Sequence, residues 1–128
     1  MTTGRDVYET ALHLLGEDSE NPELADYERR AAPLINLLIL DLTPLDGRLK
    51  AQRGLGGPED GGGTLNHLDD AVFLEEELAK GVLPFGLAAR LLQEEDPDRA
   101  AELLEQYEKS RQTAGRGRIL PIRKVWPL

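Results

Sequence analysis

The residues of this chain that could perform chemistry are carboxylates, and they gather at residues 75–77 and 94–98. Consecutive acids on a helix point in different directions, so neither cluster converges on one substrate. Neither cluster is accompanied by an identifiable base, nucleophile or histidine ligand. His13 and His67 show no metal-ligand spacing, and the absence of cysteine excludes disulfides and thiolate metal sites. The sequence therefore predicts no catalysis, no metal and no cofactor.

Two polar segments resemble binding loops only superficially. The segment EDSENPE at 17–23 fails as a calcium loop, because Pro22 interrupts the ligand run and no glycine follows in register. Residues 55–64 contain five glycines and a proline, but no strand precedes them and no Gly-Lys-Ser/Thr follows. Glu59 and Asp60 would also repel a phosphate. Such a segment gains too little burial to offset its backbone entropy, so we expect a mobile loop at about 54–64.

Charge is distributed unevenly along the chain. There are 24 acidic and 15 basic residues, and the last acid is Glu108, so the final 20 residues carry +6 and the first 108 carry −15. An acidic body with a basic tail can attract an identical neighbour or another acidic protein, although a solvated tail has the same composition. Residues 34–40 are too few to cross a membrane, and the N-terminus lacks the features of a signal peptide. We expect a soluble protein made in a cytoplasm.

The apolar periodicity predicts a mostly α fold, a single small bundle of about four principal helices. Thr3 with Asp6 forms a weak cap for the first helix and Gly16 ends it, while Asn21-Pro22 starts the second. Pro33 should bend the second helix, and a short further turn or helix should run from Thr43-Pro44 to about 53. The crowding of apolar residues at 34–42 indicates that the second helix is covered on more than one side. The predicted helices cover residues 4–15, 22–42, 73–93 and 97–114.

In the third predicted helix, Leu74, Leu78, Gly81, Phe85, Ala88 and Leu92 are spaced by four or three residues across Pro84. This unbroken register favours one helix bent at Pro84 over two separate helices. Small residues such as Gly86 and Ala89 leave room for another backbone, with ordinary core packing as the simpler explanation. The predicted core consists of Leu12 or Leu15, Tyr27, Leu34, Ile35, Leu38, Leu78, Phe85, Ala88, Leu92, Leu104 and Tyr107.

The last segment differs in character from the helical domain at 1–114. TAGRGR, at 113–118, reads as a flexible hinge, and its prolines make the rest an extended basic arm over 115–128. Its apolar side chains should dock on a surface, either on a partner or, slightly less favoured, on the chain's own helices. The predicted partner-contact residues are Arg116, Arg118, Ile119, Ile122, Arg123, Lys124, Val125 and Trp126.

Three stretches resemble, in order, a known family. These are ADYERRAAPLINLLI at 25–39, LNHLDDAVFLEEEL at 65–78, and LPFGLAA at 83–89, the last followed by an acidic turn at 94–96 and by Tyr107. Together they resemble the small head–tail connector proteins (adaptor or head-completion proteins) of tailed bacteriophages. The glycine-rich loop is longer than the usual connection in that family, which leaves the path of residues 43–68, and a short strand near 65–68, open.

The resemblance implies a structural role in the neck of a virion. Members of that family form a ring, typically of twelve copies, on the portal protein and offer a docking surface to tail-completion proteins. Packaged DNA passes through such a ring, and an acidic wall would let it slide without specific binding. Two alternatives are a small helical nucleic-acid-binding regulator that uses the basic tail, and a helical enzyme or carrier with a pocket between helices. Salt-dependent DNA binding would favour the regulator, whereas ring formation would favour the connector.

Overall fold

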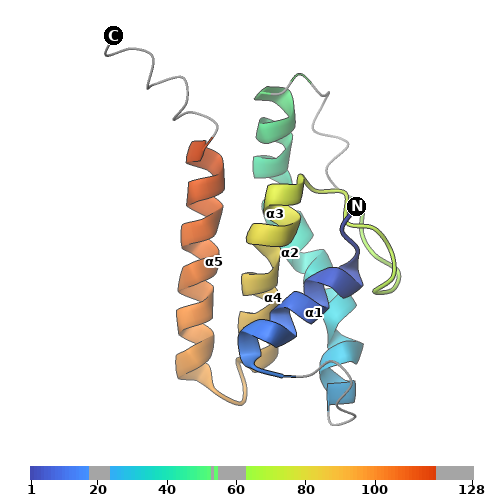
Figure 1. Cartoon of the computed structure of the whole chain (residues 1–128), viewed down its shortest axis with the longest axis vertical. Coiled ribbons are helices and arrows are strands. Elements are labelled where there is room, and N and C mark those ends of the chain that lie inside the picture. The colour runs from blue at the N-terminus through green and yellow to red at the C-terminus, as the bar shows by residue number, and fades with distance from the viewer. Residues whose placement is uncertain (18–23, 53, 55–62, 118–128) are drawn as a thin grey trace.

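The structure is a computed structural model, and it describes residues 1–17, 24–52, 54 and 63–117. These residues form five helices: α1 (Gly4–Leu15), α2 (Ala25–Gln52), α3 (Glu76–Gly81), α4 (Leu83–Leu92) and α5 (Pro97–Gly117) (Figure 1). The predicted mostly α bundle is confirmed. Within the described part of the chain there is no strand, and the region near 65–68 forms bends and turns; a single antiparallel bridge joins Thr3 to Ala71. Most of the predicted glycine-rich loop, at 55–62, lies outside the described residues.

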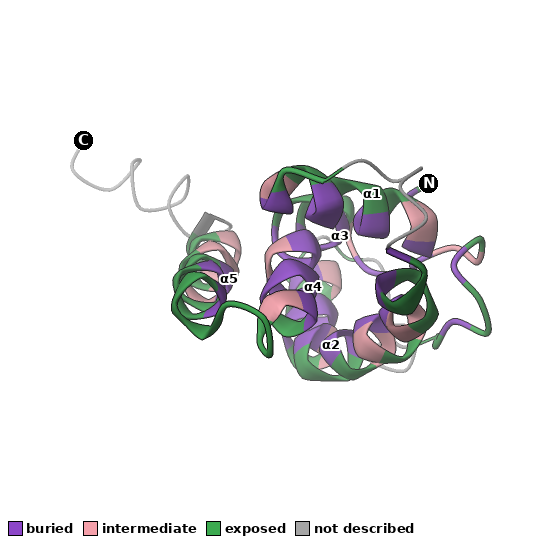
Figure 2. Ribbon diagram, turned by 90° about the horizontal axis from the view of Figure 1, so that it is seen from below, coloured by how far each residue is buried: buried purple, intermediate pink, exposed green. Residues whose placement is uncertain are grey.

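Helix α4 is the centre of the bundle. It packs against α1, α2, α3 and α5, and Figure 2 shows it lying between α1, α2 and α5. Apolar residues occupy nearly every side of α4, and most of its residues are buried. Both features are typical of a helix that other elements cover on several sides. Helix α5 packs mainly on α4, and it runs in the same direction as α2 (Figure 1). The C-terminal ends of α2 and α5 therefore lie at the same end of the molecule.

Helix α1 begins and ends where its sequence signals predict. The Thr3 hydroxyl accepts a hydrogen bond from the Asp6 backbone N–H at 3.2 Å, and the Asp6 carboxylate accepts one from the Thr3 N–H at 2.9 Å. This reciprocal pair satisfies two backbone donors that the first turn leaves free. Gly16 ends the helix in the left-handed conformation, at φ 75°.

Helix α2 corrects the prediction that the chain breaks at Thr43-Pro44, because it runs without interruption to Gln52. Both of its prolines, Pro33 and Pro44, lie on its exposed face. An interior proline removes one backbone donor, and on an exposed face water can satisfy the carbonyl left without a partner. The Thr43 hydroxyl also bonds back to the Ile39 carbonyl at 2.7 Å, so this threonine is accommodated within the helix.

The third predicted helix is also corrected. It starts at Glu76 instead of residue 73, and it is interrupted at Val82, whose φ of −120° and ψ of −51° separate α3 from α4. Pro84 has no N–H to donate to the Lys80 carbonyl, and its ring crowds that carbonyl. Pro84 therefore occupies the first turn of a new helix, where a missing N–H costs nothing.

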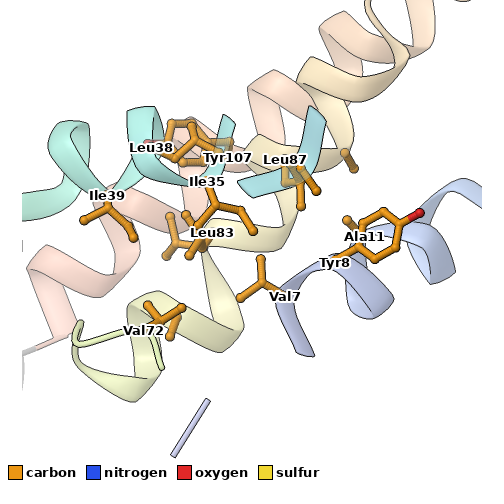
Figure 3. Close-up of a cluster of buried hydrophobic side chains, with 14 of the residues drawn as sticks. Val7, Tyr8, Ala11, Ile35, Leu38, Ile39, Val72, Leu83, Leu87 and Tyr107 are labelled. Atoms are coloured by element: carbon orange, nitrogen blue, oxygen red, sulfur yellow. The ribbon is translucent and has the colours of Figure 1, made fainter. Parts of the chain in front are cut away.

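Most of the predicted core is buried, including Tyr27, Ile35, Leu38, Leu78 and Tyr107, part of which is drawn in Figure 3. Leu12, Leu15 and Ala88 are buried as well. Leu34, Phe85 and Leu92 were predicted to be core residues but are only partly buried, and Leu104 is 45% exposed. The prediction for Leu104 is wrong because α5 turns Leu103 and Tyr107 toward α4, which leaves Leu104 at the edge of that contact.

Gly86 explains how α5 approaches α4 so closely. A Cβ atom at this position would lie 2.9 Å from Leu38 Cδ2 and 2.9 Å from two atoms of the Tyr107 ring. The Tyr107 ring therefore lies directly on the glycine backbone. The glycine at 86 therefore serves packing within the chain. This agrees with the simpler explanation from the sequence, which is ordinary core packing.

Asp46 is a fully buried charged residue that joins α2 to the segment before α3. Its Oδ1 accepts a hydrogen bond from the Glu75 N–H at 2.7 Å, and its Oδ2 forms an ion pair with Lys50 Nζ at 2.9 Å. Lys50, with a side chain 14% exposed, also donates to the Phe73 carbonyl at 3.0 Å. These three contacts fix the entry into α3 against the C-terminal half of α2.

The N-terminus is fixed to the same region. Thr2 is buried, and its hydroxyl donates to Glu76 at 2.7 Å, which lowers the pKa of that carboxyl. The Gly4 N–H donates to the Asp70 carbonyl at 2.9 Å and the Arg5 N–H to the Leu68 carbonyl at 2.6 Å. The start of α1 is thereby attached to a segment more than sixty residues later in the sequence.

Candidate interaction surface

Of the eight predicted partner-contact residues, Arg116 is the one that the structure places. It is exposed in the last turn of α5. The seven others, Arg118, Ile119, Ile122, Arg123, Lys124, Val125 and Trp126, lie outside the described residues. Helix α5 reaches Gly117, so residues 115–117 are helical, and the predicted start of the extended arm at 115 is wrong.

Arg116 borders an open groove of about 570 Å³ between the C-terminal halves of α2 and α5. Arg48 and Arg111 also line it, together with Asp41, Leu45 and Gln52, and we call it the arginine groove. Arg48 and Arg116 form no ion pair with any other residue that the structure describes. The groove therefore presents two unneutralised guanidinium groups at the end of the molecule from which the chain continues.

Arg111 is held by a network that fixes α5 beside α2. The Tyr107 hydroxyl donates to Asp41 Oδ2 at 2.6 Å, and Arg111 Nη1 donates to the same oxygen at 2.8 Å. Arg111 also pairs with Glu108 at 3.2 Å, and its guanidinium lies 5.9 Å from the centre of the Tyr107 ring. Burial, and then the Asp41 carboxylate, raise the pKa of Tyr107, so its hydroxyl stays protonated and remains a donor.

A second groove lies at the other end of α5, and we call it the α4–α5 groove. Its volume is about 310 Å³, and its lining is largely apolar with Arg90 and Gln93 at one side. The lining residues are Ala89, Arg90, Gln93, Pro97, Ala100, Ala101 and Leu104. The surrounding stretch, residues 94–108, contains seven acids and one basic residue. The groove is thus an apolar hollow within the most acidic part of the surface of α5.

Helix α2 carries a third feature, an exposed apolar stripe. Pro33, Leu37, Leu40 and Pro44 are exposed and are spaced by four, three and four residues, so they follow one face of the helix. Leu37 is 56% and Leu40 is 60% exposed. The sequence predicts that this helix is covered on more than one side, but the described residues leave this face open. Isolated exposed leucines are common, whereas a row of apolar residues indicates a contact surface.

In each of the acidic clusters at 75–77 and 94–98, one carboxylate serves local structure. Glu76 accepts from Thr2 and pairs with Lys80 at 3.2 Å. Asp96 accepts from the Arg99 N–H at 3.1 Å, which caps the start of α5. Among the described residues there is no group of three or more His, Asp or Glu side chains that could hold a metal ion. None of the helices in that part of the chain is long and apolar enough to span a membrane.

The protein is a small all-α bundle, and each end of α5 borders a groove: the arginine groove at one end and the α4–α5 groove at the other. Comparisons with known proteins found no matching family model, no matching curated protein and no matching solved structure.

Proposed function

We propose that this chain is a structural assembly protein, and specifically a head–tail connector of a tailed bacteriophage that forms a ring on the portal protein. The single observation that carries the proposal is the exposed apolar stripe on α2. Leu37 and Leu40 together expose large hydrophobic surfaces that would be buried favourably against another subunit. In a connector, that subunit is a second copy or the portal, and the free end of the ring would receive a tail-completion protein.

The arrangement of charge also supports assembly into a ring. The acidic stretch at 94–108 and the arginine groove lie at opposite ends of α5. Two different, complementary surfaces on one molecule favour head-to-tail contacts, which close into rings when the rotation between copies permits. The acidic body would give such a ring a channel wall that repels the DNA backbone, so that packaged DNA passes through without binding.

The resemblance to phage connectors adds support from the sequence. LPFGLAA at 83–89, which carries most of the resemblance, is the start of the central helix α4. Tyr107, the other marked residue, packs on Gly86 within that helix. The features that resemble the family therefore contact each other in the bundle.

The proposal is tested on the full chain by sedimentation velocity and electron microscopy, alone and mixed with a portal protein taken from the same genome. We expect closed rings, or a stable complex with the portal. Leu37→Glu with Leu40→Glu should abolish assembly and leave the circular dichroism spectrum unchanged. Phe73→Glu is the matched control, since Phe73 is a comparably exposed apolar residue, at 52%, outside the stripe. A chain that stays monomeric with the portal at every concentration would contradict the proposal.

A nucleic-acid-binding regulator is the second candidate, and the arginine groove is the observation that favours it. Arg48 and Arg116 could contact phosphates near the basic tail. Fluorescence anisotropy with duplex DNA should then show affinity that falls steeply with salt and is reduced in Arg48→Ala. Absence of binding at low salt would eliminate this candidate.

A further inference from the structure

The chain continues past the end of α5 with residues 118–128, RILPIRKVWPL, which we call the tail. It contains three basic residues, no acid, and a single tryptophan, Trp126. It leaves Gly117 next to the arginine groove, where Arg48 and Arg116 present positive charge. Like charges repel, so the nearest surface of the tail's own molecule is electrostatically unfavourable for it.

The α4–α5 groove has the opposite character. Its apolar floor, formed by Ala100, Ala101 and Leu104, offers a hydrophobic seat for a large side chain. Glu105 lies one helical turn beyond Ala101, and Asp98 lies three residues before it, so both border the same face. Asp98 forms no ion pair with another described residue, and Glu105 pairs with Lys109 at 3.1 Å on the exposed surface, a contact that a basic residue of the tail can share or replace.

The lining also suits an aromatic ring in particular. Arg90 forms one side of the groove. A guanidinium group stacks readily on an indole face, so Trp126 could contact Arg90 and the apolar floor together. Tryptophan is the side chain that most often supplies an anchor of this kind at interfaces.

The length of the tail favours a second copy over the tail's own molecule. Leu104 lies thirteen residues before Gly117 on α5, which is about 20 Å along the helix. Trp126 is nine residues beyond Gly117. A reversal of chain direction uses about four of those residues, and the other five span at most about 17 Å. Trp126 could therefore reach its own groove only with the tail almost fully extended along α5 and with the indole closing the remaining gap, whereas the groove of a second copy imposes no such requirement.

We propose that the α4–α5 groove of one copy binds the tail of a second copy, with Trp126 seated on the apolar floor and the basic residues of the tail paired with the acidic rim. This inference deepens the proposed function and rests on it, since it names one contact between copies in the ring. The contact joins two different surfaces, so a pair of copies keeps one free tail and one free groove for further neighbours.

Cysteine cross-linking tests the contact directly, because the chain contains no cysteine of its own. One batch of full-length protein carries Ala101→Cys in the groove, and another carries Pro127→Cys beside the anchor. The two are mixed over a concentration series, oxidised mildly and analysed by mass spectrometry without reduction. We expect a disulfide between the two variants. Gln106→Cys, exposed elsewhere on α5, replaces Ala101→Cys in the control and should cross-link at least about tenfold less.

Two further measurements identify the forces. Trp126→Ala in the Pro127→Cys chain should weaken association by about 30-fold or more, the ratio that corresponds to the loss of a typical anchor. Raising salt from about 0.1 M to about 1 M shortens the screening length from about 10 Å to about 3 Å and should lower the yield. Equal yields with Ala101→Cys and Gln106→Cys would overturn the inference.

The remaining outcomes separate this inference from the proposed function. A double variant with both cysteines that forms only an intramolecular disulfide at every dilution would show that the tail reaches its own groove, which overturns the inference. Rings or portal complexes without the cross-link would overturn it while the connector role stands. The specific cross-link in a protein that never associates with a portal would support the inference and remove the head–tail role.

Discussion

The buried pair of Asp46 and Lys50 allows a quantitative test of the fold. In Asp46→Asn, the amide oxygen can still accept from the Glu75 N–H, but the ammonium of Lys50 loses its counterion. Breaking one partner of a buried pair costs about 3–5 kcal/mol. Lys50 keeps its bond to the Phe73 carbonyl and slight exposure, so we expect roughly 2–4 kcal/mol. For a domain of this size that loss lowers Tm by about 10 °C.

The converse change should be at least as damaging. Lys50→Met leaves the Asp46 carboxylate, which is 0% exposed, without a positive partner, and should cost about 3–5 kcal/mol. The double variant Asp46→Asn with Lys50→Met removes both charges and keeps the acceptor for the Glu75 N–H. It should therefore be less destabilised than the sum of the single variants by about 1–3 kcal/mol.

The assay is reversible urea unfolding, followed by far-ultraviolet circular dichroism, with midpoints and slopes compared among the four proteins. A matched control is Lys80→Met, because Lys80 pairs with Glu76 on the surface and should change stability by less than about 1 kcal/mol. The reasoning is refuted if Asp46→Asn unfolds at the wild-type midpoint, or if the single effects add without coupling. Either result would mean that the pair does not hold the entry into α3.

Other substitutions probe packing and pH response. Gly86→Ala should destabilise by about 1–3 kcal/mol in the same assay, because its Cβ would crowd the rigid Tyr107 ring; an unchanged midpoint would show that α5 can move away freely. Leu87→Ala, at a fully buried site, should lower the free energy of unfolding by about 2–5 kcal/mol. Leu92→Ala should lower it clearly less, because Leu92 is partly exposed, and equal losses would show that the orientation of α4 is wrong. Burial, and then Glu95, raise the pKa of Tyr27 from 10.0 to about 12. The neutral hydroxyl is favoured in the folded state, so this contribution is complete below about pH 10 and is lost as pH rises toward 12. Tyr27→Phe should flatten that alkaline loss of stability, and an identical alkaline limb would contradict the assignment.

The elements that the sequence predicted well are those whose signals are local. The cap formed by Thr3 and Asp6 and the left-handed turn at Gly16 are set by residues within a few positions of one another. The sequence does not predict that α2 continues through Pro44. A proline ends a helix in some surroundings and is tolerated in others, and the outcome depends on whether it lies on the solvent-exposed side of the helix. The sequence also does not predict the break at Val82. The spacing of apolar residues is the same on both sides of this short interruption, so the spacing alone cannot reveal it.

Buried polar contacts and surface grooves are harder to predict from the sequence than helix ends, because they are formed by residues far apart along the chain. Asp46 has the appearance of an ordinary helical acid, and its partner Glu75 lies 29 residues away, so no local pattern marks it as buried. The choice between Leu103 and Leu104 depends on how α5 is rotated about its axis when it packs on α4, which the apolar pattern alone does not specify. The α4–α5 groove is formed by two helices, and its shape follows from how they cross, which periodicity does not specify. The predicted tail contacts came from composition alone and stay predictions.

The attachment of the N-terminus to residues 68–76 imposes an order on synthesis. Among the described helices α1 leaves the ribosome before the others, yet the groups that bind its start, including the Leu68 and Asp70 carbonyls and Glu76, emerge some seventy residues later. Its main helical partner, α4, follows only after them. Until then α2 alone among the later helices can contact α1, and most of the apolar face that carries Val7 and Leu12 stays exposed to solvent. At translation rates of about 5–20 residues per second, this exposure lasts several seconds, so α1 is made before the other described helices but is among the last of them to be fixed in place.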